Sequence, residues 1–305
     1  MNTFTDGGRI AAWSRLQEEY NRLGIYCPRT IPNLHGELSH KLTVDERDHY
    51  VYAEEFAPYD TVETIGYDKC KDDAGRVFYL DDMLRATGRV ASAHFDFCDF
   101  ASAYCLLEPF CPPDTTDEAT ECVEKFCEFV KNELPEHYSR AGRLRELFFE
   151  NQAAVRRLYP TLPVSCFQAD LNYSNILIDN GKFKGVIDFN LAGREPVLNY
   201  VTRLAINYST ENCLHDENGH ELYFFDERLD AIRCASILKN LGVIGETYSF
   251  STAEREAFPI LFRYMNSFWW EHIGTLKIIK GDSEKIGLLF SWLERQMTRD
   301  DLRLP

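Results

Sequence analysis

The sequence lacks any apolar run long enough to span a lipid bilayer, and its first residues lack the apolar segment of a signal peptide. It also lacks internal repeats and low-complexity segments of any length. These absences argue against a helical membrane protein and against a repeat or fibrous architecture. With 305 residues of ordinary globular composition, the chain is long enough for two lobes. We therefore expect a two-lobed cytoplasmic protein without a membrane partner.

Basic residues are scarce relative to acidic ones. The chain has 33 Lys and Arg residues against 49 Asp and Glu residues, which gives a net charge of -16 at pH 7. Because nucleic-acid phosphates require a basic surface, we expect no nucleic-acid partner. The acidic excess has two interpretations that composition does not separate, namely surface solubility and electrostatic attraction of a cationic substrate.

The ten cysteines include no Cys-x-x-Cys pair. Zinc sites normally use closely spaced pairs of ligands, so the pattern argues against a zinc site. In the absence of a secretion signal, we expect these cysteines to be buried thiols rather than disulfides.

The periodicity of apolar residues predicts an α+β fold. A helix is predicted over residues 8–23, followed by strands over residues 37–44 and 49–56, and Pro58 ends this unit. Further helices are predicted over residues 77–95, 116–133, 137–158, 197–209, 226–240, 252–278 and 282–298. We expect residues 1–58 to form a partial N-lobe with a hinge near residues 54–58. Residues 59–305 would form a helical C-lobe with an embedded hairpin at residues 165–190.

Within this hairpin segment, polar residues flank two apolar strands. Asp170 and Asn175 precede the first strand, Asp179-Asn180-Gly181 predicts a tight turn, and Asp188 follows the second strand. This spacing is typical of a kinase catalytic loop followed by a metal-binding Asp-Phe. Phosphoryl transfer needs a carboxylate that orients a hydroxyl, together with hard oxygen ligands for Mg²⁺. We predict that Asp170 is catalytic and that Asn175 and Asp188 bind Mg²⁺.

The competing interpretation is a surface hairpin in which Asp and Asn serve only as turn residues. Any one of these residues alone would fit that interpretation. The joint match of loop, strand, turn, strand and Ile-Asp-Phe favours the phosphotransferase site.

Three short runs carry a family resemblance. Residues 167–170 read Phe-Gln-Ala-Asp, residues 175–177 read Asn-Ile-Leu, and residues 186–189 read Val-Ile-Asp-Phe. They resemble the aminoglycoside phosphotransferase and choline kinase family, whose usual form is His-Gly-Asp, then Asn, then Ile-Asp-Phe. Looser similarity covers residues 10–300, including residues 52–58, 88–94 and 192–196. The resemblance implies a protein-kinase-like fold, ATP as donor, Mg²⁺ as cofactor, and a hydroxyl acceptor such as an aminoglycoside, a choline-like compound or another metabolite.

The resemblance also implies roles for individual residues. Glu55, Phe56 and Ala57 would form the nucleotide-binding hinge and offer backbone groups to adenine. Gln168 stands in place of the histidine that braces the catalytic loop, and its amide can still form hydrogen bonds. Asn199 stands where the family often has an aspartate that supports this loop. Acidic residues of the C-terminal helices could bind an amine of the acceptor.

The chain departs from the family pattern before the first predicted helix. Kinase-like N-lobes begin with a Gly-rich hairpin and a strand whose lysine contacts the donor phosphates. The lysines before residue 71 are Lys41 and Lys69, and both follow the helix. We therefore expect a reduced N-lobe without its first three strands. Two functions remain open: an ATP-dependent small-molecule phosphotransferase, or a nucleotide-binding or interaction module with little catalysis.

Residues 268–270, Phe-Trp-Trp, lie within the predicted helix 252–278. Their helical spacing favours a place in the hydrophobic core. A role in lining a substrate pocket is the alternative.

Overall fold

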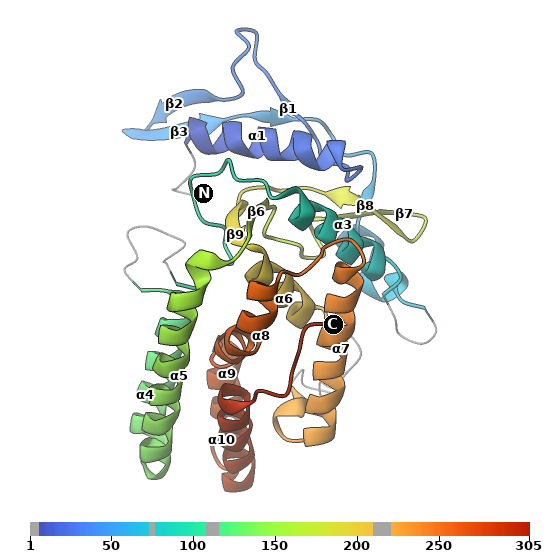
Figure 1. Cartoon of the computed structure of the whole chain (residues 1–305). Helices are drawn as coiled ribbons and strands as arrows, with labels where there is room; N and C mark the ends of the chain where they lie inside the picture. Colours follow the sequence, from blue (N-terminus) through green and yellow to red (C-terminus); the bar gives the residue numbers. More distant parts are fainter. Residues whose placement is uncertain (1–5, 73–76, 108–115, 210–220) are drawn as a thin grey trace.

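The computed structural model describes residues 6–72, 77–107, 116–209 and 221–305. A small N-terminal lobe with one helix and short strands lies over a larger, mainly helical C-terminal lobe (Figure 1). The predicted α+β class with a reduced N-lobe is thereby confirmed. None of the described helices is long and apolar enough to cross a membrane. The described cysteines are free thiols, and all of them except Cys105 are buried, as predicted.

The N-terminal lobe consists of α1 (Gly7–Arg22) and two separate two-stranded sheets. In one sheet, β1 (Thr30–Ile31) pairs with β4 (Ala53–Glu54), and in the other β2 (His40–Val44) pairs with β3 (Arg47–Val51). The predicted single strand over residues 49–56 is therefore wrong. The chain leaves the β2–β3 hairpin at Tyr52 in order to pair with β1, so the apolar stretch is divided between two partners.

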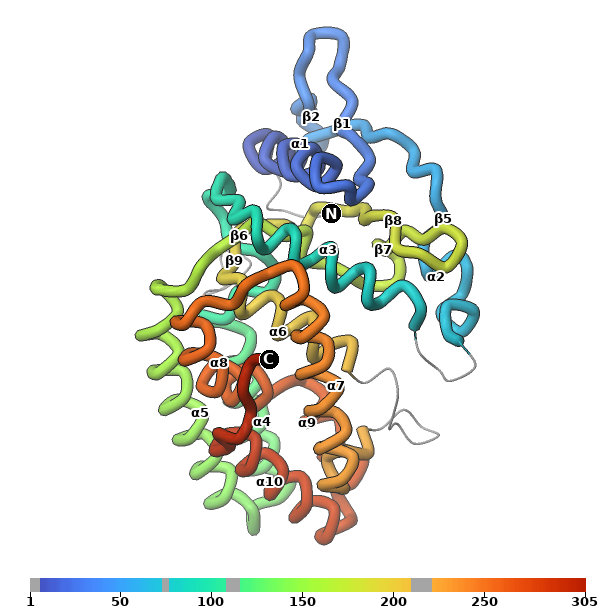
Figure 2. The backbone as a smooth tube through the Cα atoms, turned by 45° about the vertical axis from the view of Figure 1, so that its right-hand side comes forward, coloured from blue at the N-terminus to red at the C-terminus, as the bar shows by residue number. Residues whose placement is uncertain are grey.

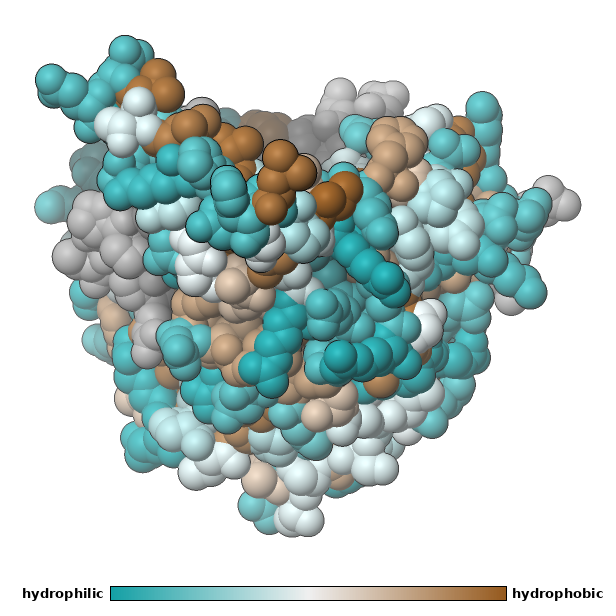
Figure 3. Space-filling view, turned by 90° about the horizontal axis from the view of Figure 1, so that it is seen from above, coloured by the Kyte–Doolittle hydropathy of each residue, from teal (hydrophilic) through white to brown (hydrophobic). Residues whose placement is uncertain are grey.

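One face of this lobe carries many apolar side chains, which gather on its upper surface when the molecule is seen from above (Figure 3). The exposed large apolar residues of the lobe are Ile31, Leu34, Leu42, Val44, Val51, Tyr52 and Phe56. The two small sheets thus contribute little to the core, and α1 supplies most of the buried contact of the lobe. Its buried apolar residues are Ile10, Trp13, Leu16 and Tyr20.

The C-terminal lobe is a bundle of helices under two small sheets (Figure 2). Its helices are α2 (Val62–Ile65), α3 (Leu80–Ala93), α4 (Glu118–Glu133), α5 (Tyr138–Leu158), α6 (Val197–Asn207), α7 (Glu227–Gly245), α8 (Thr252–Met265), α9 (Trp270–Ile279) and α10 (Ser283–Thr298). Short 3-10 helices cover Tyr67–Cys70, Pro135–His137, Tyr159–Thr161 and Leu222–Phe224. Helix α3 packs against α7, and α5 packs against α4, α8 and α10.

The predicted helix over residues 252–278 is wrong as a single element, because it is interrupted between α8 and α9. Asn266 ends α8, and its side-chain amide donates to the Gln296 Oε1 atom of α10 at 2.7 Å. The Trp269 indole N–H donates to the Met265 carbonyl at 2.7 Å. The Trp269 indole thus satisfies the Met265 carbonyl, which a backbone N–H would satisfy in a continuous helix. The break moves residues 268–270 out of helical spacing.

Two sheets position the predicted site. Strands β5 (Asp60–Thr61), β7 (Ile176–Asp179) and β8 (Lys182–Val186) form one antiparallel sheet, and β6 (Val164–Phe167) pairs with β9 (Gly193–Pro196) in the other. The predicted tight turn is confirmed: Asn180 and Gly181 have φ values of 49° and 74°, which suit a two-residue hairpin turn. Pairing of β7 with β8 and of β6 with β9 brings residues 168–175 close to residues 187–192.

The two lobes meet at a close backbone contact. Tyr26 donates its N–H to the Lys184 carbonyl, and its own carbonyl accepts from the Val186 N–H, both at 2.9 Å. Between them lies Gly185, where an added Cβ would come within 1.8 Å of the Tyr26 carbonyl oxygen. One hydrophobic core joins residues of both lobes. The division of the chain at residue 58 therefore stays a prediction.

We expect the G185A substitution to lower the melting temperature, because its methyl group must displace the Tyr26 backbone. Overpacking of this kind typically costs about 1–3 kcal/mol. The matched control is G142A in α5, where an added Cβ meets nothing within 4 Å. Thermal unfolding followed by circular dichroism should show G142A equal to or more stable than the wild type. An unchanged melting temperature in G185A would show that the lobes do not depend on this contact.

Candidate active site

The centre of the predicted site is the side-chain amide of Gln168, which is fully buried. Its Oε1 atom accepts from the Asp170 N–H at 2.7 Å. Its Nε2 atom donates to the Ile187 carbonyl at 2.8 Å and to the Asp188 carbonyl at 2.5 Å. One side chain therefore fixes the backbone at both predicted acidic residues. This geometry fits the support role that the resemblance implied for Gln168.

Helix α1 reaches the same point through Tyr20. The Tyr20 hydroxyl accepts from the Gln168 N–H at 3.0 Å, and its ring meets the Phe189 ring edge-on, with the centroids 5.5 Å apart. Burial raises the pKa of Tyr20 far above its ordinary value, so the phenol stays neutral. The N-terminal lobe thus contacts the backbone on both sides of the site.

Asp170 lies half-buried within a set of amide donors. Asn172 Nδ2 donates to its Oδ1 atom, and Asn175 Nδ2 donates to its Oδ2 atom, both at 2.8 Å. Partial burial raises the pKa of Asp170 and the nearby Asp188 carboxylate raises it further, whereas the two amides lower it. The net shift is upward. Asp170 is therefore more basic than an ordinary aspartate and has a fixed orientation.

Asn175 and Asp188 lie side by side, as the hairpin register predicts. The Asn175 carbonyl accepts from the Ile187 N–H at 3.0 Å. Both amide hydrogens of Asn175 point to Asp170, so its Oδ1 atom faces away, with the Ser174 hydroxyl at 3.2 Å. Asp188 is exposed, and its Oδ1 atom accepts from the Asn190 N–H at 3.2 Å. The pair offers one amide oxygen and one carboxylate.

This donor set suits Mg²⁺. The ion prefers carboxylate and carbonyl oxygens, and it commonly keeps several waters while one or two protein groups and the substrate phosphates complete its shell. Among the described residues, no group of three or more His, Cys, Asp or Glu side chains could hold a metal alone. The site therefore fits an ion that arrives with phosphate ligands.

Two residues of this site have a strained backbone. Ala169 and Asp188 have φ values of 62° and 58°, in the left-handed region that non-glycine residues rarely adopt. Ala169 follows Gln168 in the chain, and the Asp188 carbonyl accepts a hydrogen bond from the Gln168 side chain. Strained residues of this kind persist only where the surrounding structure holds them, and they gather at functional sites.

The N-terminal lobe contributes a carboxylate that the sequence analysis did not single out. Glu54 accepts a hydrogen bond from Gln17 Nε2 at 2.5 Å. Partial desolvation and the Asp188 carboxylate raise the pKa of Glu54, and the same two effects, with Glu54 itself, raise that of Tyr52. In the strand predicted over residues 49–56, side chains alternate between two sides, so residues 52 and 54 would share one side. This alternation is the signal that could have identified them.

Within the described residues, no Lys or Arg side chain lies at ion-pair distance from Glu54, Asp170 or Asp188. Three carboxylates thus lie near one another, and the Asp188 carboxylate raises the pKa of both Glu54 and Asp170.

The predicted nucleotide-binding residues directly follow Glu54 and strand β4 in the chain. The Glu55 N–H donates to the Arg29 carbonyl at 2.9 Å, so this group is already used within the protein. Phe56 is 97% exposed and packs against little of the protein, whereas Ala57 is half-buried. Of the three residues, Ala57 therefore offers the most suitable backbone position for a base.

Asn199 does not contact the catalytic loop in the described structure. Its amide donates to Glu195 Oε1 and to the Tyr104 carbonyl, both at 2.6 Å. Asn199 thus supports strand β9 and the segment around Tyr104. Its predicted role differs from these contacts, because α6 points this side chain away from residues 168–175.

A family model described as the phosphotransferase enzyme family matches residues 10–223. Comparison with curated protein sequences found no match.

Several solved structures are similar to the chain. An amicoumacin kinase in complex with AMP-PNP, Ca²⁺ and Ami has 12% sequence identity and a TM-score of 0.48, covering 95% of this chain and 76% of its own. A microcompartment-associated aminopropanol kinase has 12% identity and a TM-score of 0.46, with coverage of 96% and 81%. An aminoglycoside phosphotransferase from Alicyclobacillus acidocaldarius has 11% identity and a TM-score of 0.46, with coverage of 96% and 84%.

The family match includes the catalytic loop, the hairpin and the Ile-Asp-Phe run, and it extends over more than half of the sequence. The resemblance noted from the sequence is confirmed by it: the chain belongs to the phosphotransferase enzyme family.

Proposed function

We propose that the protein transfers the γ-phosphate of ATP to a hydroxyl group of a small molecule, with Mg²⁺ as cofactor. The observation that carries the proposal is the Gln168 bridge, which holds Asp170 and Asp188 at fixed positions on either side of Asn175. A catalytic carboxylate and two metal ligands in a rigid frame are the parts that phosphoryl transfer requires.

In this proposal, Asp170 orients the acceptor hydroxyl and receives its proton. The hydroxyl oxygen forms a bond to the γ-phosphorus while the bond from this phosphorus to the β–γ bridging oxygen breaks, and ADP leaves. The raised pKa of Asp170 supports the role, because a stronger base accepts the proton more readily. Asn175 and Asp188 would hold Mg²⁺, which, when bound, neutralises charge on the donor phosphates.

The three carboxylates of the site, Glu54, Asp170 and Asp188, increase the need for a bound cation. ATP alone would bring further negative charge beside Glu54 and Asp188, with no lysine or arginine of the described residues at ion-pair distance to offset it. The donor is therefore expected to bind as its magnesium complex. Ala57 would contact the adenine base by a backbone group.

The D170N substitution should lower phosphate transfer at least about 100-fold, because general acid–base groups contribute at least that factor. Transfer from labelled ATP would be measured against a panel of small hydroxyl compounds. Asn retains the size of the side chain, so the circular dichroism spectrum should not change. The control is D300N, which alters an exposed carboxylate near the C-terminus. Turnover in D170N equal to that of the wild type would rule out the assignment of Asp170.

Mg²⁺ together with ATP should raise the melting temperature of the wild type, and D188N should lose most of this shift. A ligand that binds the folded state alone stabilises it by mass action, and removal of one metal ligand weakens that binding. Differential scanning fluorimetry with ATP, with and without EDTA, measures the effect without any acceptor. An equal shift in D188N would contradict the metal assignment. A normal shift without transfer to any acceptor would instead indicate a nucleotide-binding module.

The E54Q substitution should stabilise the ligand-free protein at pH 8. Partial desolvation and Asp188 raise the pKa of Glu54 above its ordinary value of 4.5, so the folded state binds this proton more tightly than the unfolded state. Stability is then lost as the pH rises from 4.5 through the raised pKa. The advantage of E54Q should shrink as the pH falls below 4.5. E46Q, in the exposed β2–β3 turn, controls for the loss of one charge, and equal pH profiles for E54Q and wild type would refute the coupling.

A further inference from the structure

Arg203 on α6 is a buried cation that stacks on an aromatic ring. The side chain is 8% exposed, and its guanidinium carbon lies 3.6 Å from the centre of the Trp269 ring. Among the described residues, its guanidinium has no hydrogen bond and no carboxylate within 4 Å. Burial lowers the pKa of Arg203 to about 10, so it remains charged at neutral pH. A buried charge in this state is unfavourable unless an anion reaches it.

Two neighbouring cavities open onto this guanidinium. They measure about 190 and 260 Å³, and Arg203, Asn207 and Trp269 line both of them. Both are smaller than the roughly 300–1,000 Å³ that is usual for sites of drug-sized ligands. The interruption between α8 and α9 creates this space, because it turns Trp269 out of the helical register and onto Arg203. The space suits a small metabolite or one end of a larger one.

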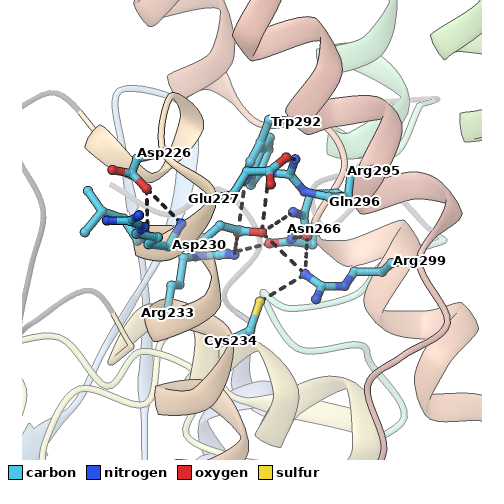
Figure 4. A network of polar contacts seen from close by, with 12 residues as sticks. Asp226, Glu227, Asp230, Arg233, Cys234, Asn266, Trp292, Arg295, Gln296 and Arg299 are labelled. Atoms are coloured by element: carbon cyan, nitrogen blue, oxygen red, sulfur yellow. Dashed lines mark hydrogen bonds and ion pairs between the residues drawn. The ribbon is translucent and has the colours of Figure 1, made fainter.

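A second arginine reaches the larger cavity from α7. Arg233 is 3% exposed and donates from Nη2 to Asn266 Oδ1 at 2.5 Å, while its Nε and Nη1 atoms have no hydrogen bond. Its nearest carboxylate is that of Asp230, at 3.8 Å from Nη1. Figure 4 shows why Asp230 cannot move closer, since it also accepts from Trp292 at 3.0 Å and from Gln296 at 2.9 Å. Arg233 is therefore held in place with unused donors.

Among the described residues, the acidic side chains that line the pocket form no ion pair with either arginine, although Glu118 and Glu271 raise the pKa of Arg203. Glu118 and Glu271 are exposed, and Glu118 accepts a hydrogen bond from the Trp270 indole at 3.0 Å. Glu221 is half-buried and is hydrogen-bonded to Tyr223. Burial and Arg233 lower the pKa of His272 to about 3, so this wall is neutral. The deep part of the pocket is thus cationic and its exposed part is acidic.

Tyr104 connects this pocket with the catalytic carboxylate. It lines the smaller cavity, and its hydroxyl accepts from Asn207 Nδ2 at 3.2 Å. Burial raises the pKa of Tyr104, Arg203 lowers it, and the Asp170 carboxylate raises it further. Tyr104 therefore lies within the electrostatic reach of both charged groups. The end of α6 joins the pocket to the catalytic loop: Asn207 lines both cavities, and the hydroxyl of the next residue, Tyr208, donates to the Leu171 carbonyl at 2.8 Å, one residue from Asp170.

We propose that this pocket binds the phosphate acceptor, and that the acceptor is a small hydroxy acid whose carboxylate pairs with Arg203. The inference rests on the proposed function, and it assigns an anionic acceptor where the net charge had left a cationic substrate open. The planar guanidinium can bind both carboxylate oxygens while Trp269 holds it flat. The hydroxyl of the bound acid would lie toward Asp170.

The test begins with binding, which needs neither ATP nor Mg²⁺. Isothermal titration would compare glycerate, glycerol and ethanolamine, which are anionic, neutral and cationic hydroxyl compounds. We expect glycerate to bind the wild type most tightly. The R203M substitution should weaken glycerate binding at least about tenfold, because it removes charge-assisted hydrogen bonds. R203K should show an intermediate loss, and R143M, which changes an exposed arginine of α5, should show none.

Transfer from labelled ATP to the same three compounds gives the second readout. Glycerate bound less tightly than ethanolamine, or bound equally by wild type and R203M, would overturn the proposal. If R203M does not fold by circular dichroism, R203K decides, and full affinity in R203K would also overturn it. Glycerate binding that depends on Arg203 without transfer to any compound would support the pocket and refute the proposed function. Transfer to ethanolamine that is unchanged in R203M would support the function and refute the pocket.

Discussion

The site depends on a single buried amide. Gln168 is both donor and acceptor, and its amide accepts from the Asp170 N–H while donating to the carbonyls of residues 187 and 188. Each partner group is removed from bulk water, so loss of the amide would leave donors and acceptors unsatisfied at a cost of about 1–3 kcal/mol each. The left-handed conformations of Ala169 and Asp188 are stable because this bridge holds the two segments together.

The local parts of this arrangement could be predicted from the sequence. Asn180-Gly181 specifies a tight turn, alternation of apolar residues specifies the two strands, and together they bring Asn175 beside Asp188. Most helices were predicted for the same reason, since their apolar spacing is local. The broken helix at Asn266 could not be predicted, because the break depends on hydrogen bonds to α10 and α7. Likewise, Glu55 loses its free N–H to Arg29, which is distant in sequence and adjacent only in the folded lobe.

Charge is separated within the molecule in a way that the net value conceals. The chain carries -16 overall, yet one polar pocket is lined by two arginines, while the predicted catalytic site gathers three carboxylates. The charge of a magnesium–nucleotide complex complements the site of three carboxylates, and the charge of an anionic acceptor complements the arginine pocket. Composition alone left surface solubility and a cationic acceptor equally open, because it counts surface residues that solvate the protein and do not contact a ligand.

The contact between Tyr26 and Gly185 also determines how the lobes can move. Two backbone hydrogen bonds flank Gly185, and no side chain separates the two backbone segments there. Translation of the N-terminal lobe along the hairpin would break both bonds, whereas rotation about this point would preserve them. We infer that the N-terminal lobe moves by rotating about Gly185. The β2–β3 hairpin would then move farthest, and the Tyr20–Gln168 contact would move least.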